Sequence, residues 1–251
     1  MTAAVMSKVA LVTGGSRGIG RAISYALAGA GYAVVVNYAS RAADAEDTAG
    51  VVRSRGGTAL TLQTDVSDAE AVARMFDVVD ARFGRLDALV NNAGIGQHVD
   101  SLVDVDDATW RRTIAVNLDG AFFCMRAAIP RLRAAGGGRI VNVSSGAAVT
   151  GGGIGAHYAA SKAGMLALTA KAARELARDH IAVNAVLPTA IETEMLVELA
   201  QDPAARARLT AQFPIGRLGR PEEVAEVVRF LVAEAPDYLT GESIPVRGGR
   251  L

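Results

Sequence analysis

The sequence predicts an α/β fold, in which a doubly wound parallel sheet is covered by helices on both faces. Two observations carry this prediction. Short apolar runs rich in β-branched residues alternate with longer segments of helical periodicity, and glycines cluster directly after the first of these runs. Strands that alternate with helices form parallel sheets with right-handed crossovers. A ligand crevice is therefore expected where the carboxyl ends of the strands meet.

The elements follow one another along the whole chain of 251 residues. Strands are expected at residues 9–12, 33–36, 59–62, 88–90, 140–143, 181–186 and 243–246. Helices are expected near residues 19–30, 42–55, 68–83, 106–134, 157–179 and 221–233. No polar linker or shift in composition divides this series, so residues 1–251 are expected to form one dinucleotide-binding and catalytic domain. Residues 189–214 are interpreted as a substrate lid, with an ordinary packed helical insertion as the alternative.

Composition excludes several classes of function. The chain has 26 Lys and Arg against 26 Asp and Glu, interspersed rather than in blocks, so neither nucleic acid nor an anionic membrane is expected as a partner. Cys124 is the single cysteine and lies in an apolar stretch, which predicts a buried thiol. No metal site is expected. Because the N-terminus lacks a signal-peptide pattern and no apolar segment approaches the roughly 20 residues that span a bilayer, we expect a cytoplasmic protein.

The loop at residues 13–20 reads TGGSRGIG and joins the first predicted strand to the first predicted helix. Glycines here allow a sharp turn and a close approach to a pyrophosphate, whose negative charge the helix N-terminus favours. Glycine turns also occur at such junctions without a ligand, and the spacing differs from G-x-G-x-x-G. The residues predicted to contact a dinucleotide in this loop are Gly14, Ser16, Arg17, Gly18, Ile19 and Gly20.

The residues after the second predicted strand indicate which nicotinamide dinucleotide is bound. An acid at this point would accept hydrogen bonds from a ribose 2′-hydroxyl and repel a 2′-phosphate. The chain instead has Tyr38, Ser40 and Arg41 here, with Arg17 in the glycine loop. NADP(H) is therefore favoured over NAD(H). Solvated surface charges are the alternative interpretation of both arginines.

Candidate catalytic residues fall at the carboxyl ends of later strands. Tyr158 and Lys162 lie four residues apart in a predicted helix and so share one face. An ammonium beside a phenol lowers the pKa of the tyrosine, which favours proton transfer at neutral pH, although such a pair is usually only a surface pair. Ser145 follows the fifth predicted strand, where its hydroxyl could bind a carbonyl oxygen, with turn chemistry as the alternative.

Two further groups end the third and fourth predicted strands. Asp65 and Val66 are positioned to contact adenine, although an Asp before Ser67 could also cap a helix. Asn92, Ala93 and Gly94 are predicted to contact the cofactor, with a plain turn as the alternative. The coincidence of all these groups at one edge of one sheet favours a catalytic site.

In their order along the chain, these motifs resemble the short-chain dehydrogenase/reductase family, and the resemblance spans essentially the whole sequence. The matching positions are Thr13-Gly14-x-x-x-Gly18-x-Gly20, Asp65-Val66, Asn91-Asn92-Ala93-Gly94, Asn117, Ser145, Tyr158-x-x-x-Lys162, and Thr193 after Pro188. The resemblance implies that Tyr158 is the general acid in reduction and that Ser145 orients and polarises the carbonyl. It implies that Lys162 binds the nicotinamide ribose and lowers the pKa of Tyr158, while Asn117 supports a water that leads protons to Lys162.

The resemblance also implies a single Rossmann-type domain with seven parallel strands, three helices on each face, and a homotetramer. Pro188, Thr189, Ile191 and Thr193 are expected to contact the cofactor. The family usually has glycine where this chain has Thr189, so the backbone beside the nicotinamide is expected to sit differently. Ser145 is preferred over Ser144 because its separation from Tyr158 resembles the family pattern.

The substrate is the least determined part of the prediction. The glycine loop and the stretches 36–38 and 191–195 are most similar to NADPH-dependent 3-oxoacyl-acyl-carrier-protein reductases, so the leading hypothesis is reduction of a 3-oxoacyl thioester or a similar ketone. An NAD-dependent dehydrogenase of a sugar, steroid or other secondary alcohol is the second, and a catalytically silent nucleotide sensor is the third. Substrate contacts are expected from Ser145, Gln97, His98, His157, Tyr158 and Met195. Arg131, Arg133 and Arg139 are candidates for contacting an acidic carrier protein, with solvated surface charges as the alternative.

Overall fold

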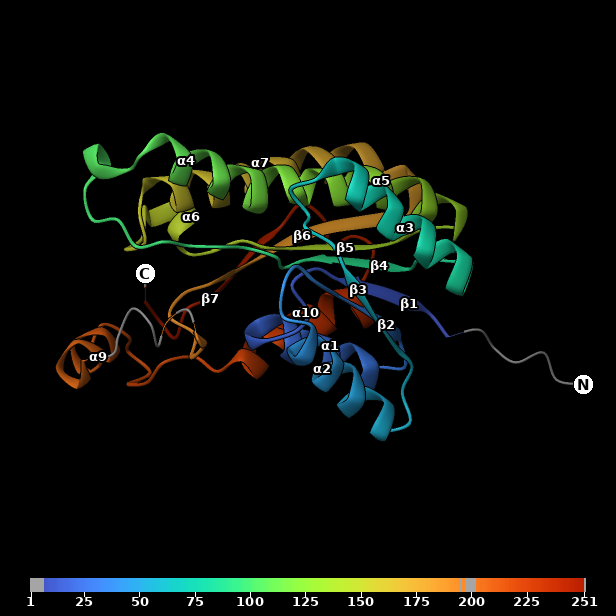
Figure 1. The fold of residues 1–251 in the computed structure, drawn as a ribbon, viewed down its shortest axis with the longest axis horizontal. Coiled ribbons are helices and arrows are strands. Elements are labelled where there is room, and N and C mark those ends of the chain that lie inside the picture. Colours follow the sequence, from blue (N-terminus) through green and yellow to red (C-terminus); the bar gives the residue numbers. More distant parts are fainter. Residues whose placement is uncertain (1–6, 195, 197–201, 251) are drawn as a thin grey trace, which may run out of the picture.

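A seven-stranded parallel sheet lies between two layers of helices (Figure 1). The computed structural model describes residues 7–194, 196 and 202–250. The strands are β1 (Val9–Val12), β2 (Ala33–Tyr38), β3 (Ala59–Gln63), β4 (Ala88–Asn91), β5 (Gly138–Val143), β6 (Ile181–Pro188) and β7 (Ser243–Val246). Every predicted strand is confirmed, and five of them extend by one or two residues beyond the predicted limits at one end.

The strand order determines where a ligand can bind. It runs β3-β2-β1-β4-β5-β6-β7, and each neighbouring pair is parallel. Successive strands are added on one side of β1 as far as β3, and the chain then returns to add β4 on the other side. A crevice opens beyond the carboxyl ends of the strands at such a reversal.

The helices divide evenly between the two faces of the sheet, as the family resemblance implies (Figure 1). One face carries α1 (Gly18–Gly29), α2 (Ala42–Ser54) and α10 (Pro221–Ala233). The other face carries α3 (Ala69–Phe83), α7 (Ala156–Leu176) and a helical run made of α4 (Asp107–Ile114), η2 (Ala115–Asp119) and α5 (Gly120–Ala134). In the part of the chain that the structure describes, none of the helices has both the length and the apolar character needed to cross a membrane.

Strand β1 shows how the core is built on both faces. Val9 and Leu11 pack into the apolar layer that faces α3, α5 and α7, whereas Ala10 and Val12 pack into the layer that faces α1 and α10. All four side chains are buried, as expected for a parallel strand covered on both faces. Cys124 is buried in the first of these layers, as its apolar surroundings in the sequence predict.

The helices depart from the predicted limits where their geometry changes. The predicted helix 106–134 contains a π-helical turn, η2, at its centre. The predicted helix 157–179 ends at Leu176 and continues as the 3₁₀ turn η3 (Ala177–Asp179), after which His180 adopts a φ of 55°. Among the described residues, three short helices are additional to the prediction: η1 (Leu102–Asp104), α6 (Ala147–Thr150) and α9 (Pro203–Thr210).

The segment 189–214, predicted as a lid, follows β6 and contains α9. Its first residues are held by backbone hydrogen bonds: the Glu192 amide donates to the Gly219 carbonyl at 2.8 Å, and the Gly219 amide donates to the Ala190 carbonyl at 3.0 Å. The substrate-contact prediction for Met195 lies outside the described residues, as do residues 197–201. The role of this segment as a lid stays a prediction.

Candidate active site

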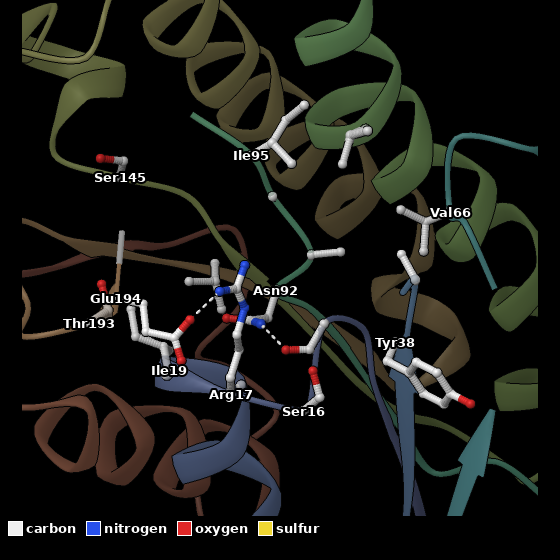
Figure 2. Close-up of a pocket in the computed structure, with 18 of the residues that line it drawn as sticks. Ser16, Arg17, Ile19, Tyr38, Val66, Asn92, Ile95, Ser145, Thr193 and Glu194 are labelled. Carbon is white, nitrogen blue, oxygen red and sulfur yellow. Dashed lines mark hydrogen bonds and ion pairs between the residues drawn. The ribbon is translucent and has the colours of Figure 1, made fainter. Parts of the chain in front are cut away.

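A cavity of about 380 Å³ lies at the carboxyl ends of the strands, at the predicted edge of the sheet. Every residue predicted to contact the cofactor lines it, as do Ser145, Tyr158 and Lys162. Figure 2 shows Ser145 and Tyr38 on opposite sides of the cavity. The cavity therefore has a catalytic end beside Ser145 and a second end where β2 finishes.

The glycine loop has the shape that a dinucleotide cradle needs. Gly14 and Gly18 have φ values of 59° and 51°, which residues other than glycine rarely adopt. Gly20 has no room for a side chain, since a Cβ there would overlap the carbonyl oxygen of Gly14. The loop ends at the N-terminus of α1, whose free amides and dipole favour a pyrophosphate. These residues fit the dinucleotide that the sequence predicts.

Side chains from the carboxyl ends of β2 and β4, the two strands that flank β1, brace the glycine loop. Asn92 donates hydrogen bonds from Nδ2 to the carbonyl oxygens of Thr13 and Gly14, each at 3.0 Å. Asn37 accepts a hydrogen bond from the Gly14 amide at 3.2 Å and donates to the carbonyl of Thr64 at 3.0 Å. Sequence reasoning missed Asn37, although an amide that follows three buried valines in a strand was a usable signal.

Asp65 holds an ion pair at the edge of the cavity. Its carboxylate accepts hydrogen bonds from the Ser67 amide and hydroxyl and from Arg112 Nη2, the last at 2.9 Å. Partial burial acts to raise the pKa of Asp65, but these hydrogen bonds outweigh it and lower the pKa. The alternative that Asp65 caps a helix is wrong, because Asp68 caps α3 by accepting from the amides of Glu70 and Ala71. Arg112, which lines the cavity, was not predicted from the sequence.

The two consecutive serines after β5 have different surroundings. Ser144 is buried and its hydroxyl donates to the carbonyl of Lys162 at 2.8 Å. Ser145 is half-buried, and its Oγ accepts a hydrogen bond from the Ala147 amide at 3.1 Å. An accepted hydrogen bond leaves the Ser145 proton free to point to the Tyr158 oxygen or to a substrate carbonyl oxygen, whereas the Ser144 proton is engaged by the backbone. This difference supports the choice of Ser145 over Ser144.

Tyr158 and Lys162 lie one turn apart on α7, as their spacing predicts. The Lys162 Nζ lies 5.8 Å from the centroid of the Tyr158 ring and donates to the carbonyl of Val143 at 2.9 Å. Burial raises the pKa of Tyr158, and a hydrogen bond with the Ser145 side chain opposes that rise. Burial lowers the pKa of Lys162 to about 8. In this structure the group that opposes the rise is Ser145, and the lowering of the Tyr158 pKa by Lys162 stays a prediction.

Asn117 does not reach the cavity but supports its wall. It is fully buried in η2, and π-helical turns are frequent at functional sites. Its Oδ1 accepts from the Ile95 amide at 2.8 Å, while its Nδ2 donates to the Ile95 carbonyl and to the Ser161 hydroxyl. Asn117 thus fixes the chain after β4 against α7. Its predicted part in a proton path to Lys162 stays a prediction.

Replacing Lys162 by methionine is expected to change how stability depends on pH. The folded protein holds the pKa of Lys162 at about 8, below its ordinary value of 10.5, so the unfolded chain binds more protons between these two pH values. Wild-type stability should therefore rise relative to the variant by about 3 kcal/mol across this range. Urea unfolding of both proteins at a series of pH values measures this. A difference that stays constant would contradict burial as the cause of the shift.

The catalytic end of the cavity is bordered by apolar side chains. Ile95 and Ile154 line it together with Thr189 and Tyr158. Gly96 lies so close that a Cβ there would be 3.2 Å from Ile154 and 3.3 Å from the Tyr158 ring. In the described chain, the charged residues that line the cavity are Arg17, Arg41, Asp65, Arg112, Lys162 and Glu194. Apart from Lys162, none of them belongs to the group around Ser145 and Tyr158.

The other predicted substrate contacts lie elsewhere. His157 is fully buried and its Nε2 is 3.0 Å from the Gln97 carbonyl oxygen, so the prediction that His157 touches substrate is wrong for this conformation. Its position instead ties the chain after β4 to α7. Gln97 and His98 are exposed and do not line the cavity, and His98 lies 3.3 Å from Asp100. Contact of Gln97 and His98 with substrate stays a prediction.

Thr189, which stands where the family usually has glycine, fits without unusual backbone geometry. In the described chain, His180 is the one residue other than glycine with a positive φ. The Thr189 amide donates to the Val246 carbonyl at 3.2 Å, and its methyl group occupies the space that a Cβ on Gly146 would take, 2.6 Å away. A glycine at 146 thus provides room for the threonine. The expectation that the backbone here sits differently from that of the family stays a prediction.

The arginines proposed to meet a carrier protein lie away from the cavity. Arg139 is near the start of β5, at the opposite edge of the sheet from Ser145. Arg139 pairs with Asp237 at 2.7 Å, Arg133 with Asp179 at 2.7 Å, and Arg131 with Asp80 at 2.6 Å. Their position and their neutralisation by acids favour the alternative of solvated surface charges.

Comparisons with known proteins agree with this geometry. A family model described as enoyl-(acyl carrier protein) reductase matches residues 14–250. A cis-4-hydroxycyclohexanecarboxylate dehydrogenase from Sinomonas cyclohexanicum is 43% identical over 99% of this chain and 98% of its own length. A 3-oxoacyl-acyl-carrier-protein reductase from Staphylococcus aureus is 40% identical over 97% of this chain and 98% of its own. The crystal structure of a proposed short-chain alcohol dehydrogenase from Sinorhizobium meliloti 1021 has a TM-score of 0.91 and 38% identity, covering 97% of this chain and 96% of that one.

Proposed function

Because the chain belongs to the short-chain dehydrogenase/reductase family, whose members act on CH–OH and C=O groups, we propose that it reduces a 3-oxoacyl thioester or a related ketone with NADPH. The position of Arg17 and Arg41 is the observation that favours NADPH over NADH. Both line the end of the cavity where β2 finishes, and the residues that follow β2 include no acid before Asp44. Guanidinium groups bind phosphate oxygens through charge-assisted hydrogen bonds.

The catalytic proposal assigns one task to each side chain. NADPH, when bound, supplies the hydride. The Ser145 hydroxyl donates a hydrogen bond to the carbonyl oxygen of the substrate and holds it beside Tyr158. The Tyr158 hydroxyl gives its proton to that oxygen as negative charge develops there. Lys162 contacts the ribose beside the nicotinamide and, as a cation behind the Tyr158 ring, stabilises the phenolate that remains. Oxidation of an alcohol uses the same groups in reverse.

The substrate proposal depends on the apolar border of the catalytic end. Ile95 and Ile154 favour an uncharged acyl chain or ring over a substrate with a charge next to the reacting carbon. The similarity to a 3-oxoacyl-acyl-carrier-protein reductase supports a thioester. An acyl carrier protein that delivers it would approach the mouth of the cavity and not the arginines of α5 and β5.

The proposed function is tested by following NADPH or NADH oxidation with acetoacetyl-CoA as the substrate. We expect turnover of the thioester and a kcat/KM at least about tenfold higher with NADPH, since a phosphate paired with arginines contributes on the order of 1–3 kcal/mol. Cyclic ketones without a thioester serve as the comparison substrates. Turnover of these alone, or equal rates with the two cofactors, would contradict the corresponding part of the proposal.

A second candidate is an NAD-dependent dehydrogenase of a cyclic secondary alcohol. It is favoured by the 43% identity to the cis-4-hydroxycyclohexanecarboxylate dehydrogenase and by Glu194, whose carboxylate already neutralises Arg17 and Arg41. Oxidation of cis-4-hydroxycyclohexanecarboxylate with NAD⁺ in the same assay distinguishes the two candidates. A nucleotide sensor without catalysis is set aside, because Ser145, Tyr158 and Lys162 meet in one cavity.

We further propose a cytoplasmic homotetramer. Trp110 on α4 and Phe122 on α5 are each about two-fifths exposed. Large exposed apolar side chains favour contact between copies.

A further inference from the structure

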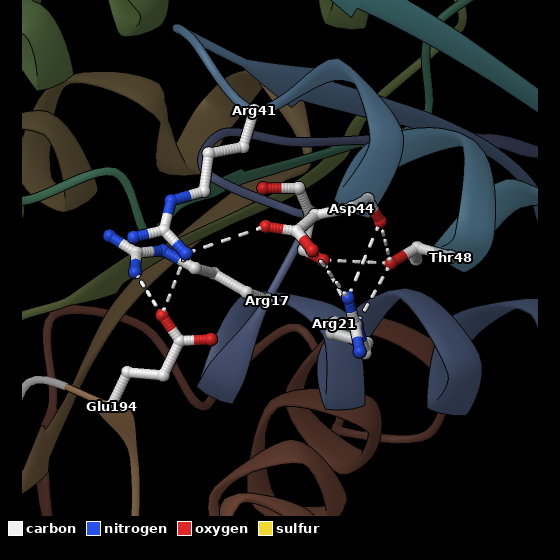
Figure 3. A network of polar contacts seen from close by, with 7 residues as sticks. Arg17, Arg21, Arg41, Asp44, Thr48 and Glu194 are labelled. Carbon is white, nitrogen blue, oxygen red and sulfur yellow. Dashed lines mark hydrogen bonds and ion pairs between the residues drawn. The ribbon is translucent and has the colours of Figure 1, made fainter. Parts of the chain in front are cut away.

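The carboxylate of Glu194 pairs with both Arg17 and Arg41 at the end of the cavity where β2 finishes (Figure 3). Glu194 Oε2 accepts a hydrogen bond from Arg17 Nη1 and lies 3.1 Å from Arg41 Nη1. The three side chains come from different parts of the chain: the glycine loop, the start of α2 and the segment after β6. The hydrogen bond from Arg17 is the main cause of a lowered pKa of Glu194, so this carboxyl is ionised at neutral pH.

The pairing differs from an ordinary surface salt bridge in its position. Glu194, Arg17 and Arg41 all line the cavity, and in the described chain Glu194 is the one acid that pairs with Arg17. Arg41 has a second, longer contact of 3.7 Å with Asp44. The guanidinium groups that would receive a phosphate are thus already engaged by a carboxylate of the same chain.

We propose that Glu194 is a specificity-determining residue, which competes with the 2′-phosphate of NADP(H) for Arg17 and Arg41 and so weakens the preference over NAD(H). The proposal rests on the assignment of these arginines to the 2′-phosphate. A phosphate dianion cannot share the two guanidinium groups with a carboxylate without like-charge repulsion, so NADP(H) must displace Glu194. A ribose 2′-hydroxyl carries no charge, and NAD(H) binds with Glu194 in place.

Displacement of Glu194 by a phosphate would also change how the segment that carries it is held. Thr193 lies on the glycine loop, since a Cβ on Gly18 would be 3.3 Å from Thr193 Cγ2. Leu196, on the other side of Glu194, lines the cavity. NADP(H) therefore removes the contact between Glu194 and Arg17 that holds this segment, whereas NAD(H) leaves that contact in place.

The test compares Glu194→Gln with Glu192→Gln in the full chain by calorimetric titration with NADPH and with NADH. Glu192 is a matched control: it is two residues away and similarly exposed, but it pairs with Arg206 and does not line the cavity. We expect Glu194→Gln to tighten NADPH binding about fivefold or more and to change NADH binding less than about twofold. Glu192→Gln should alter neither. Melting temperatures without cofactor check that both variants fold as the wild type does.

The effect of Glu194→Gln should also vanish when Arg17 and Arg41 are both alanine, because the competing charges are then gone. Unchanged or weaker NADPH binding in Glu194→Gln, or an equal gain for both cofactors, would overturn the proposal. The ratio of the two wild-type affinities tests the proposed NADPH preference separately. A wild type that favours NADH, with a Glu194→Gln variant that gains NADPH affinity alone, would refute the proposed cofactor and support the inference about Glu194.

Discussion

Replacing Tyr158 by phenylalanine is expected to lower kcat for carbonyl reduction by about a thousandfold, within the range that general acid catalysis contributes. The variant loses the hydroxyl that donates the proton but keeps the ring, which packs beside Gly96 and Lys162. Cofactor affinity should change little, because the glycine loop and the arginines are untouched. Steady-state kinetics and titration with NADPH measure the two quantities on the same preparation.

Tyr32→Phe is the matched control for this substitution. Tyr32 is also buried, and its hydroxyl donates to the Val232 carbonyl at 3.2 Å, far from the cavity lining. Its loss should cost about 1 kcal/mol of stability and leave kcat unchanged. Substantial turnover by Tyr158→Phe would show that another group protonates the substrate oxygen.

Replacing Gly20 by alanine is expected to abolish dinucleotide binding and to destabilise the fold by several kcal/mol. The new Cβ would overlap the Gly14 carbonyl oxygen and lie 2.5 Å from Asn92 Nδ2, so the backbone of the glycine loop must move. The same movement breaks the hydrogen bonds by which Asn92 holds Thr13 and Gly14. Denaturant unfolding and titration with NADPH measure the two effects.

Gly29→Ala tests whether the effect is steric. Gly29 ends the same helix, and a Cβ there would meet no atom within 4 Å. This variant should bind cofactor normally and be as stable as the wild type or slightly more so, since alanine is favoured over glycine in helices by about 0.5–1 kcal/mol. Normal binding by Gly20→Ala would mean that the loop has room which the structure does not show.

The sequence predicted many of the residues that line the cavity, because their signals are local. Gly14, Gly18 and Gly20 follow a strand directly, and a tight turn at this point is specified by residues that are neighbours in the sequence. Tyr158 and Lys162 share a helix, so their spacing alone places them on one face. Alternation of strands and helices then brings these local groups to one edge of one sheet.

The prediction of the substrate end was weaker because its contacts join distant parts of the chain. His157 was expected to face substrate, but it turns to the Gln97 carbonyl, and no local pattern distinguishes the two directions. The π-helical turn at Asn117 was hidden within a long helical pattern, since a single extra residue in a turn barely alters the periodicity. Arg112 reaches Asp65 across 47 positions of sequence.

The sequence by itself determined the α/β class, the strands, the glycine loop and the side chains proposed as catalytic, because each depends on residue type and spacing within one or two elements. Only the tertiary structure decided which charges meet. From the sequence, Arg17 and Arg41 were predicted to be cations available to a 2′-phosphate. In the folded chain, Glu194 forms ion pairs with both. A pairing of residues 177 and 153 positions apart follows from the packing of the whole sheet, and no local pattern encodes it.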